Sequence, residues 1–492
     1  MKNIAPSEKI ACNTSRKTIM ANTMTSAALL EAKEQRTRNI YFASTAAAAA
    51  IAGFLFGYDG AILGGTILFM KHQFNLTPAG VGMVMTSSTI GCIIGPFLGG
   101  WMCDRIGREK TLLVSAALLG IGALMTAIAS TISIFNIFRV VGGLGIGLGS
   151  IASPMYIAEV APPKIRGKLG LTFQLAIVVG SAAAPLVSYP ISLWATPDMA
   201  WRWMFASQLV VVLLLMLFVY LLPPSPRWLA DMGRYDEALG VLKKVHGDEL
   251  AAVELAEIKQ SVNEEQGGWR ELWLPGIRFA LLVGLLLAFF NNWTGWSAMA
   301  NYIPTLIEMS GVNAQNANNP NDHSTAILQF FLVYVAMTVT TIISIWLVDK
   351  VGRRPLWIFA SILMGIITFV SGLVFHLHIH GIFVLLVLML CTVPHGIALG
   401  GLPWLMMSEL YPNRIRAKAV AVTTTFLWIV IFTCNQFFPV FVDMSTKAIG
   451  SAAGVFWLFT VIDILALVFG LTIMPETKGR TLENIADSWR KK

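Results

Sequence analysis

One carboxylic acid, Asp59, stands within a long apolar stretch of the sequence, close to Gly57 and Gly60. A charged side chain at the depth of a bilayer is costly, so an acid in such a stretch is by default a functional residue. Burial favours its protonated form, whereas a nearby cation favours its charged form. Arg139, in another apolar stretch, is the natural partner. A pair that separates when Asp59 gains a proton could couple proton entry to transport; the alternative is a purely structural ion pair.

Charged residues also cluster at two places that repeat along the chain. The repeat pairs Asp104-Arg105-Ile106-Gly107-Arg108 with Asp349-Lys350-Val351-Gly352-Arg353, and Glu159 with Glu409, about 250 residues apart. Acids and bases so placed could form charge networks that hold one side of the protein closed. The alternative is that the arginines anchor loops at lipid headgroups. The candidate gate residues are Asp104, Arg105, Arg108, Glu159, Arg166, Asp349, Arg353, Arg354, Glu409 and Arg416.

These residues lie in or beside apolar stretches that are long enough to cross a membrane. About 20 apolar residues span the hydrocarbon core of a bilayer. Hydrophobic residues make up 56% of the 492 positions and charged residues only 13%, about half the charged share of a soluble chain. We therefore predict an all-α polytopic membrane protein with twelve transmembrane helices. The predicted spans are residues 41–70, 79–102, 111–130, 132–155, 170–193, 203–222, 277–309, 325–348, 356–375, 381–407, 418–441 and 450–474.

The repeat divides the twelve spans into two halves of six, and a transporter so built has its solute site at the interface of the halves. Pro224-Ser225-Pro226 repeats loosely as Pro475-Glu476-Thr477 at nearly the same spacing. Between Pro223 and Pro275 charges alternate with apolar residues, which predicts short amphipathic helices. The predicted units are 1–40 (cytoplasmic tail), 41–222 (N-terminal half), 223–275 (cytoplasmic linker helices), 276–474 (C-terminal half) and 475–492 (cytoplasmic tail).

The net charge of +8 is distributed unevenly between alternate loops. With the N-terminus inside, Arg105, Arg108, Arg353 and Arg416 fall on the cytoplasmic side with most other basic loop residues, as the positive-inside rule requires. We therefore expect a multi-pass protein of the inner or plasma membrane with both termini cytoplasmic. The first 38 or so residues lack the features of a signal peptide. The basic residues form no aromatic-interleaved face, so we expect no nucleic-acid partner.

Several motifs occur in an order that is specific to one family. They are Gly53-Phe54-Leu55-Phe56-Gly57-Tyr58-Asp59, Gly100 through Arg108, Pro154-Met155-Tyr156-Ile157-Ala158-Glu159-Val160-Ala161-Pro162, Pro226-Arg227-Trp228-Leu229 and Pro475-Glu476-Thr477-Lys478-Gly479-Arg480-Thr481-Leu482-Glu483. Together they resemble the sugar porter branch of the major facilitator superfamily from about Gly53 to Ile485. The resemblance implies a monosaccharide or polyol as solute and alternating access as mechanism. It further implies that Asp59 and Arg139 mark proton symport, and that the gate residues lock the outward-facing state.

The family's solute pocket implies a set of contact residues here. Sugar hydroxyls need donors and acceptors, and apolar sugar faces stack on aromatic rings. Two departures change the pocket: the seventh span has shorter residues where the family has two glutamines, an Asn and a Tyr, and Pro403 directly precedes Trp404 instead of standing three positions before it. Glucose is therefore not assumed as the solute. The candidate solute-binding residues are Phe56, Gln174, Asn291, Asn292, Ser297, Asn301, His395, Trp404 and Trp428.

Other signals are weaker. His395 stands where the family usually has an aromatic ring, and it could bind solute, titrate, or simply pack. Gly143, Gly145, Gly147 and Gly149 imitate a nucleotide-binding loop, but they lie inside an apolar span, where close helix packing explains them better. The sequence holds no nucleophile elbow, zinc-binding helix or Walker loop. We expect no enzymatic activity, no cofactor and no metal.

Three alternatives to a proton-coupled sugar symporter stay open. The same fold could carry a cyclic polyol or small organic acid, for which Arg139 is the obvious intramembrane cation. It could act as a facilitator, or as a nutrient sensor that transports nothing. A sensor would be expected to have a long cytoplasmic extension, and the segment after Pro475 is short. The expected partners are a small polar solute, the proton and membrane lipid, and we expect a monomer.

Overall fold

The structure, a computed structural model, describes residues 44–48, 50–160, 163–246, 248–262, 268–309, 323–412 and 415–478. Within these residues twelve helices are long and apolar enough to cross a membrane, which confirms the predicted count. The first six are Ser44–Gln73, α2 (Pro78–Ile106), α3 (Arg108–Ala127), α4 (Ile132–Val160), α5 (Pro163–Trp194) and α6 (Pro197–Tyr220). The last six are α10–α11 (Ile277–Trp293, Trp296–Met309), α12 (Ser324–Val351), α13 (Arg353–His376), α14–η3–α15 (Ile382–Pro394, His395–Leu399, Gly401–Glu409), α16 (Arg416–Ile449) and α17 (Ala453–Thr472).

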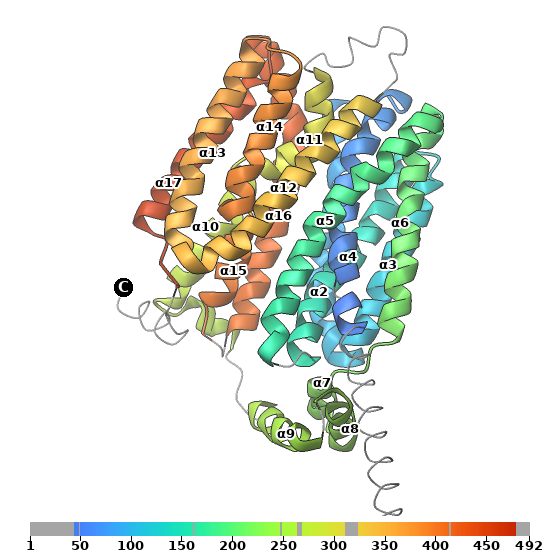
Figure 1. The fold of residues 1–492 in the computed structure, drawn as a ribbon, viewed down its shortest axis with the longest axis vertical. Coiled ribbons are helices and arrows are strands. Elements are labelled where there is room, and N and C mark those ends of the chain that lie inside the picture. The colour runs from blue at the N-terminus through green and yellow to red at the C-terminus, as the bar shows by residue number, and fades with distance from the viewer. Residues whose placement is uncertain are drawn as a thin grey trace, which may run out of the picture.

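The first six spans and the last six form two bundles that stand side by side (Figure 1). In the first bundle α4 packs against α2 and α3, and α3 packs against α6. In the second, α13 packs against α17, and α10 packs against α16. The bundles meet along two seams, α2 against α16 and α5 against α12. Helices of both bundles therefore line the boundary between them.

Two spans are interrupted part of the way across. The seventh is broken at Gly295 between α10 and α11, where a φ of +98° favours a residue without a side chain. The tenth contains the π-helical turn η3 between α14 and α15. Irregular backbone at membrane depth is tolerated where protein or a cavity surrounds it. We therefore infer that both interruptions face the interior of the protein and not the lipid.

The glycines of α4 allow its close packing against α2. A Cβ on Gly143 would lie 1.8 Å from the carbonyl oxygen of Ser88, and one on Gly147 would lie 2.7 Å from the Cα of Gly95. No side chain fits in these gaps. The interpretation of the α4 glycines as packing residues is confirmed, and they form no nucleotide loop.

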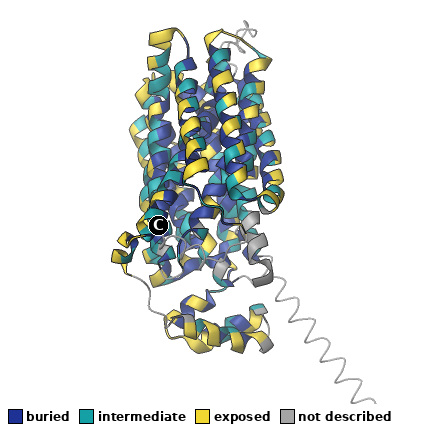
Figure 2. Cartoon of the chain, turned by 90° about the vertical axis from the view of Figure 1, so that its left-hand side faces the viewer, coloured by how far each residue is buried: buried dark blue, intermediate teal, exposed yellow. Residues whose placement is uncertain are grey.

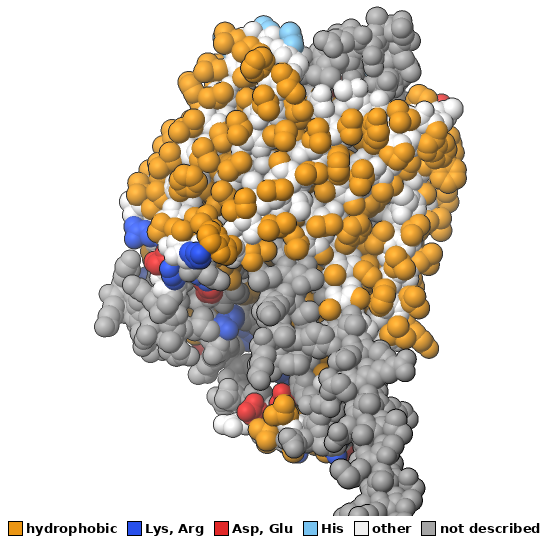
Figure 3. Space-filling view, viewed as in Figure 1, with side chains coloured by type: hydrophobic (Ala, Val, Ile, Leu, Met, Phe, Trp, Pro, Cys, Tyr) orange, Lys and Arg blue, Asp and Glu red, His pale blue; other side chains and the backbone are white. Residues whose placement is uncertain are grey.

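The outer surface of the bundles is apolar. Burial follows the inward faces of the helices, whereas their outward faces are exposed (Figure 2). On α6 the exposed side chains include Val210, Leu213 and Leu217, each more than half exposed. Hydrophobic side chains cover the face of the bundles seen in Figure 3, and charged ones gather at one end. A surface of this kind and height suits the hydrocarbon core of a bilayer.

Between the bundles in sequence lie four short helices: α7 (Pro226–Asp231), α8 (Tyr235–His246), α9 (Asp248–Val262) and the 3-10 helix η1 (Trp269–Trp273). Buried apolar residues of α7, α8 and α9, such as Leu229, Leu242 and Leu255, form a small core of their own. The predicted amphipathic helices are thus present. They lie beneath one end of the bundles (Figure 1), here called the linker end.

Candidate transport site

Asp59 and Arg139 form a buried ion pair inside the first bundle. Both residues are 3% exposed, and the guanidinium donates from Nη1 to Oδ1 at 2.5 Å and from Nη2 to Oδ2 at 2.8 Å. Two parallel hydrogen bonds fix the orientation of both groups, and charge assistance makes them strong. The structure brings together the two residues that the sequence singled out, 80 positions apart.

Two polar side chains complete the surroundings of this pair. Gln208 on α6 donates from Nε2 to Asp59 Oδ1 at 2.8 Å, and Arg139 Nη2 also donates to Ser88 Oγ on α2 at 3.0 Å. The guanidinium lies 5.4 Å from the ring centre of Phe205. Helices from four spans therefore converge on one carboxylate. Sequence reasoning missed Gln208 and Ser88, because a single polar residue in a span carries no motif.

The seventh-span asparagines lie in the interior of the second bundle. Asn291 Nδ2 donates to the carbonyl oxygens of Leu399 and Gly400 at 2.8 and 2.9 Å. Asn292 Nδ2 donates to Asn291 Oδ1 at 3.2 Å and to the carbonyl of Ala288 at 3.3 Å. An amide nitrogen has two hydrogens, so both amides already use their donors on protein acceptors. Their predicted role in solute binding remains a prediction.

Farther along the seventh span, Asn301 meets a residue that the sequence did not single out. Asn301 Nδ2 donates to Asn435 Oδ1 at 2.8 Å, and Asn435 Nδ2 reaches Ser297 Oγ at 3.5 Å. The Tyr302 hydroxyl donates to the backbone carbonyl of Asn435. This α11–α16 cluster joins two of the predicted solute residues, Ser297 and Asn301, through Asn435. No local motif marks Asn435, which lies in α16, 134 positions after Asn301.

Two predicted aromatic residues meet across the bundles. The rings of Phe56, on the first helix, and Trp428, on α16, lie 5.7 Å apart in an edge-to-face arrangement. The buried indole Nε1 of Trp428 has no hydrogen-bond partner among the described residues. Gln174 on α5 is half-buried, and Trp404 on α15 is 39% exposed. Trp428 therefore offers a donor group, and Trp404 is the most open residue of the predicted set.

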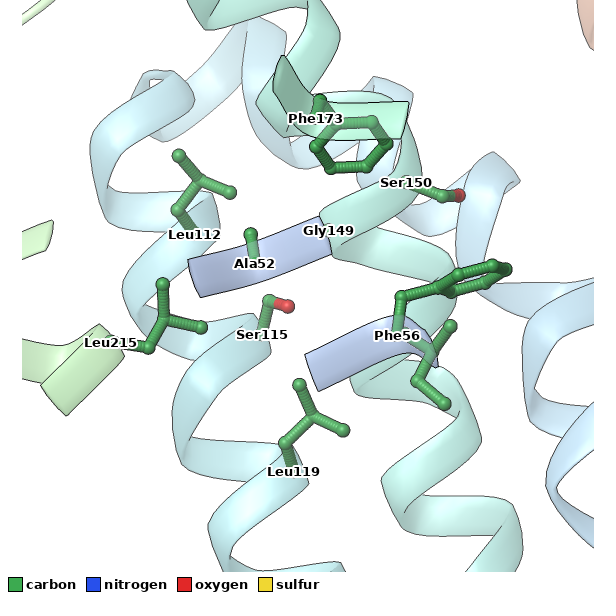
Figure 4. Close-up of a pocket in the computed structure, with 10 residues that line it drawn as sticks. Ala52, Phe56, Leu112, Ser115, Leu119, Gly149, Ser150, Phe173 and Leu215 are labelled. Carbon is green, nitrogen blue, oxygen red and sulfur yellow. The ribbon is translucent and has the colours of Figure 1, made fainter. Parts of the chain in front are cut away.

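A small cavity lies beside Phe56, enclosed by helices of the first bundle (Figure 4). Its walls are mainly apolar, from residues such as Leu112 and Phe173, with the hydroxyls of Ser115 and Ser150 as the polar groups. The volume is about 20 Å³, enough for a water molecule but not for a sugar. This cavity is therefore too small to hold a sugar.

Two further ionisable side chains are buried in the second bundle. His395 lies in η3, 5.6 Å from the ring of Trp296, and its Nδ1 has no hydrogen-bond partner among the described residues. Asp463 on α17 is fully buried, and its Oδ2 accepts a hydrogen bond from Thr368 Oγ1 at 3.0 Å. Neither lies against the Asp59–Arg139 pair, which belongs to the other bundle.

At the linker end of the first bundle, a second buried ion pair joins two of the predicted gate residues, Arg108 and Glu159. Arg108 donates to Glu159 at 2.8 Å, and Ser225 Oγ, just before α7, donates to the other carboxylate oxygen at 2.5 Å. Trp228 Nε1 donates to the backbone carbonyl of Asp104. The Arg105 guanidinium lies 5.0 Å from the Trp101 ring. The linker is thus fixed to the bundle through this cluster.

The second bundle has a corresponding cluster. Arg353 donates to Glu409 at 3.2 Å, and Thr477 Oγ1 donates to the other oxygen of Glu409 at 2.6 Å. Arg354 donates to the carbonyls of Gly470 and Leu471, and Arg416 to the carbonyl of Tyr411. The predicted residues Arg166 and Asp349 have side chains outside the part that the structure describes. Among the described gate residues, each of these ion pairs joins two members of one bundle.

At the opposite end the two bundles touch. Thr86 Oγ1 on α2 donates to Gln436 Oε1 on α16 at 2.8 Å, and Gln436 Nε2 donates to the carbonyl of Ala79. A Cβ on Gly82 would lie 2.4 Å from the backbone oxygen of Gln436. The ring of Phe69 meets that of His323, just before α12, at 4.8 Å. This end is therefore closed in the structure.

The sequence matches a known family over almost its whole length. Residues 45–489 match the family described as "Sugar (and other) transporter". The chain is 36% identical to the arabinose-proton symporter of Bacillus subtilis over 450 residues, covering 90% of this chain and 94% of that protein. It is 32% identical to the D-xylose-proton symporter of Escherichia coli, covering 91% and 96%.

Solved structures agree with this match. A structure of the xylose transporter XylE from E. coli in an inward-open conformation has a TM-score of 0.78 at 31% identity, covering 91% of this chain and 100% of that one. A structure of the same proton:xylose symporter bound to 6-bromo-6-deoxy-D-glucose has a TM-score of 0.75, covering 92% and 100%.

Proposed function

The chain belongs to the sugar porter family of the major facilitator superfamily, and from this premise we propose that it is a proton-coupled symporter of a monosaccharide or polyol. One observation carries the proposal. The carboxylate of Asp59 lies 2.5–2.8 Å from an arginine and a glutamine of other helices, closed off from solvent. Such a group changes its hydrogen-bonding needs when it takes a proton, and its neighbours must respond.

The response begins at Arg139. A protonated Asp59 no longer balances the guanidinium, and a buried cation without a counter-ion is strongly unfavourable. Ser88 on α2 and the ring of Phe205 on α6 remain beside Arg139 and provide weaker contacts. The four helices that hold the pair therefore favour different packing in the two protonation states. A proton on Asp59 can in this way shift the balance between conformations.

The contacts at the two ends support alternating access as the mechanism. The bundles touch at the end of Thr86 and Gln436, whereas the Arg108–Glu159 and Arg353–Glu409 pairs of the described linker-end residues each lie within one bundle. We take the linker end as cytoplasmic, with both termini there, by the positive-inside rule. In the conformation of this structure the side away from the cytoplasm is then closed, and the cytoplasmic side is the one that opens. It works as a monomer of two six-helix halves, divided at residues 223–275, in contact with lipid.

The solute is recognised between the halves. Phe56 and Trp428 provide apolar ring surface, and the indole N–H of Trp428, which has no partner within the described parts of the chain, is a donor for a hydroxyl. Gln174 and the half-buried Asn301 add polar groups from either side. Relatives named as arabinose and xylose symporters support small neutral sugars as the first solutes to test.

The test uses vesicles containing the purified protein, with D-xylose and L-arabinose as labelled solutes. A symporter of one proton can accumulate a neutral sugar about tenfold for each unit of pH difference, because one unit corresponds to 1.36 kcal/mol. Asp59→Asn should lower this ratio to about 1 while exchange of labelled for unlabelled sugar continues. Asp443→Asn, which removes an exposed acid of α16, is the matched control. Proton-driven accumulation by Asp59→Asn equal to that of the control would end the proposal.

A further inference from the structure

Pro403 leaves a gap in the hydrogen bonds of the tenth span. In a helix the carbonyl of residue 399 accepts from the N–H of residue 403, but position 403 is a proline, which has no N–H. Within membrane protein the freed carbonyl must find another donor, because water does not reach it. The Leu399 carbonyl is thus an orphan created by the sequence itself.

Asn291 supplies that donor. Its Nδ2, on α10, donates at 2.8 Å to the Leu399 carbonyl and at 2.9 Å to the Gly400 carbonyl. These two bonds use both amide hydrogens. The acceptor Oδ1 receives a bond from Asn292. Asn291 therefore has no donor left for a solute in this state.

A second carbonyl of the same turn is held from α12, where Ser344 Oγ donates to the Ile397 carbonyl at 2.7 Å. Just before the turn, at the end of α14, the Thr392 carbonyl accepts from Thr340 Oγ1 at 3.3 Å. The turn itself is closed by the N–H of Gly400, which donates to the His395 carbonyl five residues before it. A Cβ on Gly396 would lie 2.1 Å from Thr340 Oγ1. Side chains of two other spans thus donate hydrogen bonds to carbonyls of the π-helical turn. Turns of this kind often mark a functional site.

We propose that Asn291 is a positioning residue that clamps the tenth span at Leu399 and Gly400, in place of the backbone donor that Pro403 lacks, and that it does not bind the solute. The clamp joins the seventh and tenth spans, both of which are interrupted helices, into one rigid unit. Two departures from the family pattern, the short amide at 291 and the proline at 403, are then one feature, because they are in contact through Leu399.

The first test needs no solute. Hydrogen–deuterium exchange of the purified protein should show faster exchange of the backbone amides of 395–404 in Asn291→Ala, by at least about tenfold for a lost clamp. Pro403→Ala restores an N–H opposite the Leu399 carbonyl. In the double variant Asn291→Ala/Pro403→Ala the exchange should return most of the way to that of Pro403→Ala alone. Asn292→Ala is the matched control, because among the described residues its amide bonds to its own helix and to Asn291 and not to the tenth span; it should leave 395–404 slow.

Additive effects of the two substitutions, or unchanged exchange in Asn291→Ala, would overturn the clamp. These outcomes are independent of transport, so they stand even if no sugar is carried.

The second test depends on the proposed function. Sugar exchange by Asn291→Ala should keep its KM for D-xylose within about threefold and lose at least about fivefold in maximal rate, and Pro403→Ala should restore part of that rate. Asn291→Gln, which keeps the amide but moves it by a methylene, should behave like Asn291→Ala. A solute-binding amide would instead show a KM raised about tenfold or more in Asn291→Ala and restored in Asn291→Gln, and this result would overturn the proposal. Absence of exchange in the unaltered protein would count against the sugar assignment alone.

Discussion

The two gate clusters at the linker end use the same parts in different surroundings. Arg108, Glu159 and the hydroxyl of Ser225 correspond to Arg353, Glu409 and the hydroxyl of Thr477. The side chains of the first ion pair are 5% and 8% exposed at a separation of 2.8 Å, whereas those of the second are 12% and 23% exposed at 3.2 Å. The two halves thus share the same Arg–Glu contact but differ in how far it is buried. The exposed fraction of the side chains should set how much stability is lost when one partner of the pair is removed.

The largest expected effect follows from breaking the more buried pair. Arg108→Met should lower the free energy of unfolding by about 3–5 kcal/mol, because Glu159 is left charged and without its cation in a closed site. Denaturant titration of the detergent-solubilised protein measures this. The double variant Arg108→Met/Glu159→Leu should regain most of the loss, since replacing both partners removes the uncompensated charge. A single variant as stable as the unaltered protein would show that Glu159 is hydrated.

Breaking the more open pair should cost less. Arg353→Met should lower the free energy of unfolding by about 1 kcal/mol, because Glu409 is partly exposed and water can replace the lost partner. The same titration, run beside Arg108→Met, gives the difference directly. Equal losses in the two variants would mean that the exposed fraction does not set the strength of these pairs, and the comparison would fail.

The smallest expected effect concerns Glu476, which belongs to the second cluster because it accepts hydrogen bonds from the backbone N–H groups of Arg353 and Arg354. Partial burial would raise the pKa of Glu476, but hydrogen bonds from the backbone N–H groups of Lys478, Arg353, Arg354 and Thr477 outweigh it and hold the pKa below the usual 4.5. A lowered pKa in the folded protein means stabilisation that is complete above the unfolded value and is lost as the pH falls through the folded one.

Glu476→Gln should therefore lower the free energy of unfolding at neutral pH by less than about 1 kcal/mol, since the carboxylate is partly exposed to solvent. The difference from the unaltered protein should shrink as the pH falls below about 4.5. Unfolding midpoints measured from pH 7 down to about pH 3 test this. A difference that grows toward acid pH would reverse the sign and contradict the assignment of the N–H contacts.

Much of the fold could be predicted from the sequence, because a bilayer imposes one length on every span. The count of twelve and the break between α6 and α10 follow from runs of apolar residues. The ends of spans were less predictable. α16 continues to Ile449, eight residues beyond the predicted end, and in this extension Asp443 and Lys447 pair across one helical turn at 2.7 Å. Charged residues end an apolar run without ending a helix.

The site was predictable only where a residue is unusual for its surroundings. Asp59 and Arg139 stand out because charge is rare in apolar stretches, and the structure pairs them. Gln208 and Asn435 do not stand out, because uncharged polar residues are common in membrane helices and their partners lie more than a hundred positions away. The double use of the Asn291 amide likewise depends on the three-dimensional placement of α10 against η3.

The contact at Gly82 has a consequence for how the protein shuts. There α2 lies so close to α16 that a Cβ on Gly82 would fall 2.4 Å from the backbone oxygen of Gln436 and 2.9 Å from its Nε2. The contact depends on the absence of a side chain at position 82, because any larger residue there would force α2 or α16 to shift. The missing side chain at position 82 thus allows the two helices to approach closely, and the hydrogen bond from Thr86 to Gln436 holds them together.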